Sequence, residues 1–367
     1  MLEAKPLCIA GTLALFFVAG CNDNTPSSSS KTSVEQNKKV PGDVFDLSPW
    51  NILLPVDADG DGKADRVHNG DLPRYQLDEF FYLDADNNMV FAAANKAFTS
   101  PTSTNTRSEL RQVYPDKDGN VPSFDNPKNY FALASHPNTD QFAALGGRME
   151  ARLKVNHVST HAKYEDKPPA FSVVVGQIHA GKLDALRDEQ SGFGWGNEPL
   201  KIYYKKYPHH EAGTVFWNYE RNLPEKNPDR IDIAYPVWGN GWNDNTDPKE
   251  QGIALGESFS YIVNVYGDTM YLTFSADNHP TVEHQINLAN NVDAYGQVDS
   301  EDDPVGYKND WLFFKAGAYN QCSTKDAPTF RYPACPGTGD WETDKADGNY
   351  TSVSFSHLHV GAAVAVK

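Results

Sequence analysis

Short runs of β-branched and aromatic residues, separated by clusters of Gly, Pro, Asn and Asp, fill the chain from about residue 44 to its end. Runs such as "RMEARLKVNHV" and "LKIYYKKY" alternate in the period of a strand that has one buried face. The stretch "VNVYGDTMYLTF" places Gly-Asp between two such runs and predicts a β-hairpin. Long helical periodicities are scarce. We therefore predict one all-β domain over residues 44–367, a β-jelly-roll sandwich with a curved sheet that forms a groove.

Two of the predicted strands carry polar side chains on a single face. In "NTRSELRQV", Arg107, Glu109 and Arg111 share one face because strand side chains alternate. In "VVVGQIHA", Gln177 and His179 share a face in the same way. A glutamate between two arginines can hold their guanidinium groups and lower the cost of placing two cations together. The opposite face of both strands is mostly apolar.

A third strand shows the same division. In "WLFFKAGAYNQ", Lys315, Tyr319 and Gln321 lie on one face, opposite Leu312 and Phe314. Each of the three strands is a weak signal by itself. Together they predict a groove lined by Arg, Gln, His, Lys and Tyr side chains.

The overall charge limits what this groove can bind. The chain has 32 Lys and Arg residues against 49 Asp and Glu residues, which gives a net charge of -17. This balance excludes a general nucleic-acid binder, which would need a broad basic surface. A polyanionic substrate fits only if the cations are gathered in a local cleft, as the three strands predict.

The N-terminus has the features of an export signal. The apolar run "CIAGTLALFFVAGC" is too short to span a membrane, and its ending, Val18-Ala19-Gly20-Cys21, resembles a bacterial lipobox. We predict a lipoprotein signal peptide over residues 1–20 and a lipid anchor at Cys21. The mature protein would then be exported and anchored to the membrane in the periplasm or at the cell surface. The alternative is an ordinary secretory signal and a secreted protein.

A polar, Ser-rich stretch over residues 21–43 has no periodicity and predicts a flexible tether. Removal of Cys8 with the signal and lipidation of Cys21 leave Cys322 and Cys335 as the remaining pair. An exported protein with two cysteines most simply joins them in a disulfide, although two free buried thiols are the alternative. We expect a monomer.

The acidic loop "DADGDGKAD" has two interpretations. Asp57, Asp59, Asp61 and Gly62 match the start of a calcium-binding loop, but its twelfth position is His68 where a bidentate glutamate is needed. A structural calcium ion is one interpretation, and a solvated turn is the other.

The segments "RSELR", "QIH" and "FFKAGAYNQ" are similar to the three signature segments of alginate lyases of polysaccharide lyase family 7, in the same order. The resemblance covers about residues 45–360 and departs inside the motifs at Phe313, where the family usually has tyrosine. It implies cleavage of alginate by β-elimination, with no required metal or cofactor. Arg107 and Gln177 would neutralise the uronate carboxylate. His179 would be the base, and Tyr319 would give a proton to the leaving oxygen.

The resemblance also implies contacts to flanking uronates. Matching motif positions are Arg111, Lys315, Asn320 and Gln321, with Glu109 holding the arginines. Lys201 and Tyr203, together with Lys205, alternate onto one face of "LKIYYKKY" and would extend the groove. Tyr319 could also serve as a base for mannuronate if the neighbouring arginines favour its phenolate.

Other functions remain open at this point. A non-catalytic alginate-binding lipoprotein would keep the cations but would not need a His and a Tyr at these positions. A glycoside hydrolase would need two carboxylates, and Glu109 is the only acid in the three motifs. In the family, Ile between the Gln and the His, here Ile178, is associated with guluronate-containing blocks. Endolytic or exolytic action depends on whether loops close one end of the groove.

Overall fold

The computed structural model describes residues 38–183 and 193–366, and the folded unit begins at Lys39. The predicted signal peptide, Cys21 and most of the predicted tether lie outside the described residues. The last tether residues, Pro41–Asp43, form a 3-10 turn (η1) in which Pro41 is buried. Within the described part of the chain, no helix is both long enough and apolar enough to cross a bilayer.

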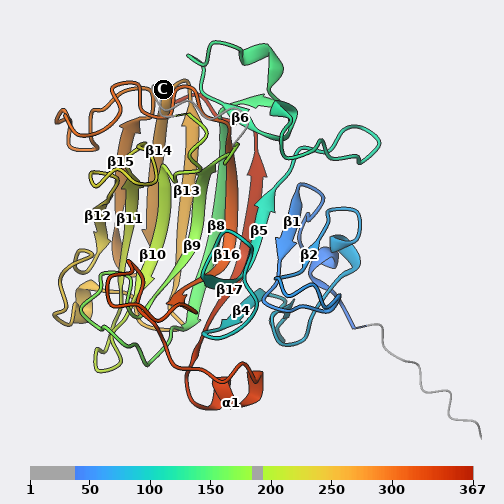
Figure 1. Ribbon diagram of the computed structural model, residues 1–367, viewed down its shortest axis with the longest axis vertical. Coiled ribbons are helices and arrows are strands. Elements are labelled where there is room, and N and C mark those ends of the chain that lie inside the picture. The colour runs from blue at the N-terminus through green and yellow to red at the C-terminus, as the bar shows by residue number, and fades with distance from the viewer. Residues whose placement is uncertain (1–37, 184–192, 367) are drawn as a thin grey trace, which may run out of the picture. The chain divides into compact units, whose positions relative to one another are not determined.

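Two large sheets pack face to face and form the predicted jelly-roll sandwich (Figure 1). The ten-stranded sheet has the order β12-β11-β10-β9-β16-β5-β1-β2, and a short parallel pair, β6 and β7, joins it at β16. Its strands are β1 (Trp50–Leu53), β2 (Arg66–Val67), β5 (Asn105–Gln112), β6 (Phe131–Ala132), β7 (Ala144–Leu145), β9 (Ser172–Ala180), β10 (Leu200–Lys205), β11 (Thr214–Glu220), β12 (Asp232–Trp238) and β16 (Leu312–Ser323).

The seven-stranded sheet has the order β15-β14-β13-β8-β17-β4-β3 and is antiparallel throughout. Its strands are β3 (Phe81–Leu83), β4 (Met89–Ala94), β8 (Gly147–His157), β13 (Ser258–Tyr266), β14 (Thr269–Ala276), β15 (His279–Asn287) and β17 (Tyr350–Gly361). The helical segments are short: η2 (Leu72–Arg74), η3 (Pro127–Asn129), η4 (Thr139–Gln141), η5 (Lys249–Gln251) and α1 (Trp341–Ala346).

Alternation along β8 explains how the seven-stranded sheet folds. Met149, Ala151 and Leu153 point inward and are buried, while Glu150 and Arg152 lie between them on the outer face and stay partly exposed. Each fully buried large apolar side chain contributes about 1.5–3 kcal/mol. The predicted hairpin is confirmed as β13 and β14, and Gly267 takes the positive φ that its turn requires.

One strand forms from a segment with a weak strand signal. "DIAYPVW" forms β12, although it begins with Asp232 and contains Pro236, which cannot donate to a ladder. The strand tolerates the proline because β12 is the last strand at its edge of the sheet and pairs only with β11. Strand signals that depend on apolar alternation are weak for such an edge.

The three polar strands of the sequence become neighbours in space. β16 lies between β9 and β5, with Lys315 opposite both Gln177 and Arg111 and with Tyr319 opposite Arg107. Gly317 allows β16 to pass close to β5, because a side chain there would meet the Ser108 carbonyl at 2.5 Å. The sheet therefore gathers the motif residues on its outer face, away from the core.

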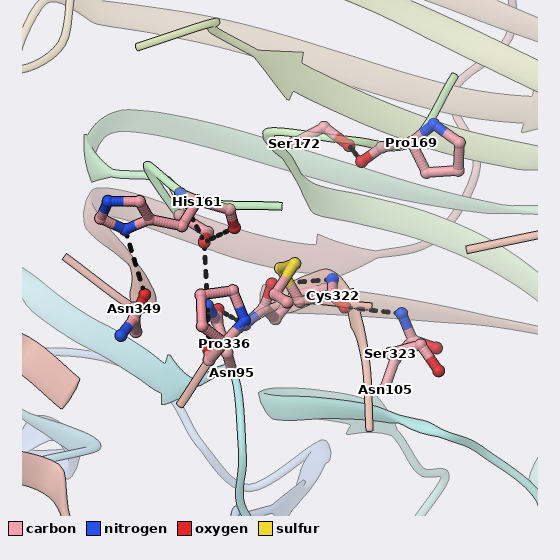
Figure 2. The surroundings of a disulfide bond; sticks show 12 residues. Asn95, Asn105, His161, Pro169, Ser172, Cys322, Ser323, Pro336 and Asn349 are labelled. Atoms are coloured by element: carbon pink, nitrogen blue, oxygen red, sulfur yellow. Dashed lines mark hydrogen bonds between the residues drawn. A yellow bond between two sulfur atoms is a disulfide. The ribbon is translucent and has the colours of Figure 1, made fainter. Parts of the chain in front are cut away.

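The predicted disulfide between Cys322 and Cys335 is present, with the two Cα atoms 5.4 Å apart (Figure 2). It closes a loop that leaves the sheet directly after β16. The backbone of this region is fixed by amide side chains: Asn105 donates to the Asn320 carbonyl at 3.2 Å, and Asn95 donates to the Pro336 carbonyl at 3.0 Å. We call the segment over residues 322–335 the disulfide loop.

Candidate active site

Arg107 and Tyr319 stack on each other on the outer face. The guanidinium carbon of Arg107 lies 3.6 Å from the centre of the Tyr319 ring, so the cation stacks on the aromatic face. Ser103 accepts a hydrogen bond from the Arg107 guanidinium at 2.8 Å. These contacts fix both side chains before any substrate arrives.

Glu109 holds the centre of the cluster. Its carboxylate pairs with Arg107 at 3.0 Å and also contacts Lys315 and the side-chain amide of Gln177. Burial acts to raise the pKa of Glu109, but Lys315 and Arg107 outweigh it and hold the pKa below its ordinary value. Burial lowers the pKa of Lys315 to about 8. Glu109 is only 2% exposed, so its contacts are with Arg107, Lys315 and Gln177 and not with the open surface.

The sequence predicted that Glu109 holds both arginines, but the partners of Arg111 are other residues. Its guanidinium donates to the side-chain oxygen of Asn129 at 3.0 Å and to the Gln112 carbonyl at 2.8 Å. It also stacks on the Phe313 ring, 4.2 Å from its centre, and lies 4.6 Å from the centre of Phe124. Burial lowers the pKa of Arg111 to about 10. Phe313, which replaces the usual tyrosine, is therefore a stacking surface for this cation.

Tyr319 is only 8% exposed, and this burial bears on whether its phenol ionises. Burial raises the pKa of Tyr319, and Tyr332 raises it further, while Arg107 acts in the opposite direction. The net shift is upward, so the phenol keeps its proton at neutral pH. This state suits a proton donor and does not support the prediction of a phenolate favoured by the arginines.

His179 is oriented by two oxygen atoms. Nδ1 lies 2.6 Å from the Ala180 carbonyl, and because a carbonyl only accepts, the hydrogen of this contact is on Nδ1. Nε2 lies 3.2 Å from a carboxylate oxygen of Glu198. The ring also stacks on Phe313, with a centroid distance of 5.3 Å. Glu198 did not emerge from the sequence because it sits in a short connection just before β10, outside every strand pattern.

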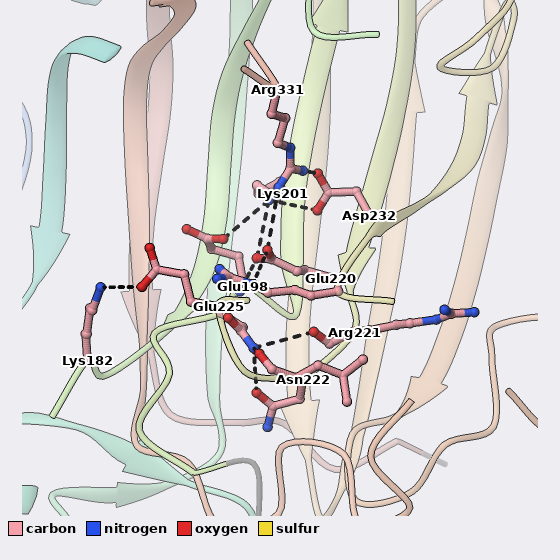
Figure 3. Close-up of polar contacts among 12 residues, drawn as sticks. Lys182, Glu198, Lys201, Glu220, Arg221, Asn222, Glu225, Asp232 and Arg331 are labelled. Atoms are coloured by element: carbon pink, nitrogen blue, oxygen red, sulfur yellow. Dashed lines mark hydrogen bonds and ion pairs between the residues drawn. The ribbon is translucent and has the colours of Figure 1, made fainter. Parts of the chain in front are cut away.

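Lys201 lies on the outer face, as its alternation predicts, but it does not line an open groove. Its amine pairs with Asp232 at 2.8 Å, Glu198 at 3.3 Å and Glu220 at 3.5 Å (Figure 3). The Lys201 side chain is 2% exposed. The carboxylates that surround this cation come from β11, β12 and the segment before β10, which the sequence alone could not place together.

Tyr203 and Lys205 also differ from the prediction of an extended groove. Tyr203 is fully buried, stacks on Phe216 at 5.0 Å and meets the edge of Trp242 at 5.0 Å. The Lys205 amine donates to the carbonyls of Pro168 and Trp242 at 2.8 and 3.2 Å. Loop residues therefore cover the outer face of β10 and β11.

Asn320 and Gln321 are each 1% exposed and have protein partners instead of an open surface. Asn320 donates to Asn95 at 3.0 Å and accepts from the Cys322 backbone at 3.0 Å, so it fixes the end of β16. Gln321 donates to the Tyr319 carbonyl at 3.3 Å. This placement differs from the predicted role of both residues as sugar contacts.

Two features near the site were not anticipated. The guanidinium carbon of Arg66, on β2, lies 4.6 Å from the centre of the exposed Phe124 ring. Arg111 contacts the same ring. Arg331, in the disulfide loop, contacts Asp232 and lies 3.6 Å from Glu220. Both arginines come from segments without strand alternation, so no pattern in the sequence marked them.

The acidic loop brings one carboxylate oxygen each from Asp57, Asp59 and Asp61 within 4.8 Å of one another. Backbone N–H groups of Asp61 and Gly62 donate to Asp57 at 2.9 Å, and Lys63 pairs with Asp61 at 2.7 Å. These local bonds account for the conformation as a turn. The donor set suits a hard cation such as Ca²⁺, but it lies apart from the residues that act on substrate.

A jelly-roll sheet that gathers arginine, glutamine, histidine and tyrosine on neighbouring strands of one face is the arrangement of a polysaccharide lyase. A family model described as alginate lyase matches residues 45–362. An alginate lyase of Klebsiella pneumoniae is 34% identical over 292 residues, covering 78% of this chain and 85% of the relative. The chain therefore belongs to the alginate lyases of polysaccharide lyase family 7.

Solved structures agree with this assignment. The crystal structure of the alginate lyase from Klebsiella pneumoniae is similar with a TM-score of 0.67 and 27% identity, covering 89% of this chain and 99% of that one. An exolytic family 7 alginate lyase from Zobellia galactanivorans is similar with a TM-score of 0.67 and 32% identity, over the same shares of the two chains.

Proposed function

We propose that this alginate lyase cleaves 1,4-linked uronate chains by β-elimination at the cluster of Arg107, Gln177, His179 and Tyr319. The observation that carries the proposal is the stacking of Tyr319 on Arg107. His179 lies on β9, the strand that pairs with the Tyr319 strand β16. A cation, an amide, a base and a proton donor are the groups that an elimination next to a carboxylate needs.

The reaction removes the proton at C5, forms a double bond between C4 and C5, and breaks the bond from C4 to the glycosidic oxygen. The C5 proton is weakly acidic because its removal places a second negative charge beside the carboxylate. Arg107 and the side-chain amide of Gln177, which is fully buried and held by Glu109, would stabilise that charge. His179 takes the proton, and Tyr319 gives its proton to the leaving oxygen.

We further propose that guluronate-containing blocks are preferred. The support is the family association of Ile at position 178, which lies between Gln177 and His179. Ile178 is fully buried and belongs to the hydrophobic core, so it would act by setting the position of its two neighbours and not by touching the sugar.

Digestion of block-defined alginates tests this function. The protein should release products that absorb in the ultraviolet through their new double bond, fastest from polyguluronate or mixed blocks. Faster cleavage of polymannuronate would contradict the preference. Binding without any absorbing product would favour the alternative, a non-catalytic alginate-binding lipoprotein.

We also propose that the protein is an exported lipoprotein held to a membrane by a lipid on Cys21, and that it acts as a monomer. The support is the lipobox-like ending Val18-Ala19-Gly20-Cys21. Cys21→Ser should move the protein from the membrane fraction to the soluble fraction. An unchanged distribution would contradict the anchor.

The elimination as proposed uses no metal. The acidic loop at Asp57, Asp59 and Asp61 would at most hold a structural calcium ion. A chelator should therefore leave cleavage unchanged, and added calcium would raise the unfolding temperature if the loop binds it. Loss of cleavage upon chelation would contradict the metal-free proposal.

A further inference from the structure

The outer face of the ten-stranded sheet differs on the two sides of the catalytic strands. On the β5, β1 and β2 side lie Arg111 and Arg66, which share the exposed Phe124 ring. Among the residues that the structure describes, neither arginine pairs with a carboxylate. Neither charge is therefore neutralised by a carboxylate of the protein, which suits both arginines to the carboxylates of a uronate chain.

On the β10, β11 and β12 side, the same face is closed. Tyr203, Phe216 and Asn218 are fully buried there, and Trp242 packs on the two aromatic rings. Arg331 reaches down from the disulfide loop to Asp232, above Lys201 (Figure 3). A polysaccharide cannot lie on strands whose outward side chains are already covered by protein.

Charge reinforces this closure. Glu198, Glu220 and Asp232 are matched by three cations, Lys201, Arg230 and Arg331. Each of these cations is therefore engaged by a carboxylate of the protein. Beyond Arg331, a cavity of about 600 Å³ is lined by Asp232 and Asp244 together with Asn, Gly, Ala and Trp residues, and by no basic residue. The cations of this cluster are therefore not available to the carboxylates of a uronate chain.

The disulfide loop is held in place at several points. The disulfide fixes its two ends, and Lys163 pairs with Asp326 at 2.8 Å on its exposed side. Lys167 donates to the Pro328 carbonyl at 2.8 Å. Tyr332 lies near enough to Tyr319 to raise the pKa of that phenol. The loop is thus a fixed wall beside the proton donor.

We propose that Arg331 and the disulfide loop close the groove beyond His179, so that the enzyme binds alginate on one side only and cleaves near a chain end. The polymer would extend from Tyr319 over Arg111 toward Arg66, and its end would stop against the contact between Arg331 and Asp232. This inference rests on the proposed function, because it assigns the direction of the substrate at that same site.

Following viscosity and ultraviolet absorbance together during digestion of long alginate tests the inference on the wild-type protein. Cleavage near an end releases short products, so absorbance should rise while viscosity stays high. An early fall in viscosity at low absorbance would mean internal cleavage and would overturn the inference. A complete lack of absorbance on every alginate would contradict the proposed function itself.

Two changes open the wall. Arg331→Ala removes the contact to Asp232 and Glu220, and Cys322→Ser with Cys335→Ser releases the ends of the loop. Either should cause a several-fold larger fall in viscosity at equal absorbance, with longer products. Arg152→Ala is the matched control, because it removes a partly exposed ion pair with Asp277 in the other sheet and leaves the disulfide loop untouched.

The wild type and both altered proteins could all cleave near chain ends. Arg331 and the disulfide loop would then not be what restricts cleavage to chain ends, and the inference would be overturned. Thermal unfolding of each variant shows whether it is folded, and the wild-type measurement stands even if one variant is not.

Discussion

The two sides of one sheet face make the most informative comparison in this molecule. β5 and β10 both alternate polar and apolar side chains, and both send their polar residues outward. On β5 these residues form the reactive cluster, whereas on β10 the corresponding residues Lys201 and Tyr203 are buried under inserted loops. Alternation therefore decides which way a side chain points, but the loops decide whether a substrate can reach it.

Tyr319→Phe should have the largest effect on the reactive side. The change keeps the ring and its stacking on Arg107 but removes the proton that goes to the leaving oxygen. Cleavage of every alginate block should nearly vanish while alginate binding, followed by calorimetry, is retained. A variant that stays active on all blocks would show that the proton comes from elsewhere.

His179→Ala should be more selective. General base catalysis contributes about 10²–10⁴ in rate, so polyguluronate cleavage should fall by that order. Guluronate and mannuronate differ in configuration at C5, so their protons approach from opposite faces of the sugar. Rates on the two homopolymers check whether mannuronate cleavage is less affected. Equal residual rates would rule out separate bases for the two sugars.

Arg107→Ala should leave the charge that develops at C5 without its cation. Removing one such group typically costs about 10²–10³ in kcat. Rates at saturating alginate measure this, and Arg152→Ala is a matched control because Arg152 forms a half-exposed ion pair with Asp277 in the other sheet. A loss smaller than about tenfold would argue against Arg107 as the neutralising group.

Lys201→Met should have the smallest effect on alginate binding and the clearest effect on stability. It leaves Glu220 and Asp232 buried without Lys201, and breaking a buried pair in this way costs about 3–5 kcal/mol of unfolding free energy. Denaturant unfolding measures this, with Lys163→Met as the exposed counterpart, which should change the unfolding free energy little. A rise in KM with unchanged stability would show that Lys201 contacts the substrate, as the sequence predicted.

Much of this arrangement follows from short-range pattern. The hairpin at Gly267, the disulfide and the outward face of Arg107, Gln177 and Tyr319 could all be predicted, because each depends on local alternation, turn chemistry or a small number of cysteines. The position of β16 between β9 and β5 was not predicted, since strand order is not encoded in any one segment.

The remainder depended on contacts between distant segments. Glu198 and Arg331 lie in irregular connections, and their partners are on strands far away in sequence. The burial of Asn320 and Gln321 follows from the way the chain turns after β16. Neither kind of contact leaves a periodic signal, so the sequence predicted an open groove where the structure has a wall.

Digestion of polyguluronate in water labelled with a heavy oxygen isotope tests the central claim, elimination at this cluster, most directly. The account predicts ultraviolet-absorbing products whose new ends carry no label, because no water is added across the broken bond. The same products should be missing with Tyr319→Phe. Labelled, non-absorbing products would mean hydrolysis and would contradict the account.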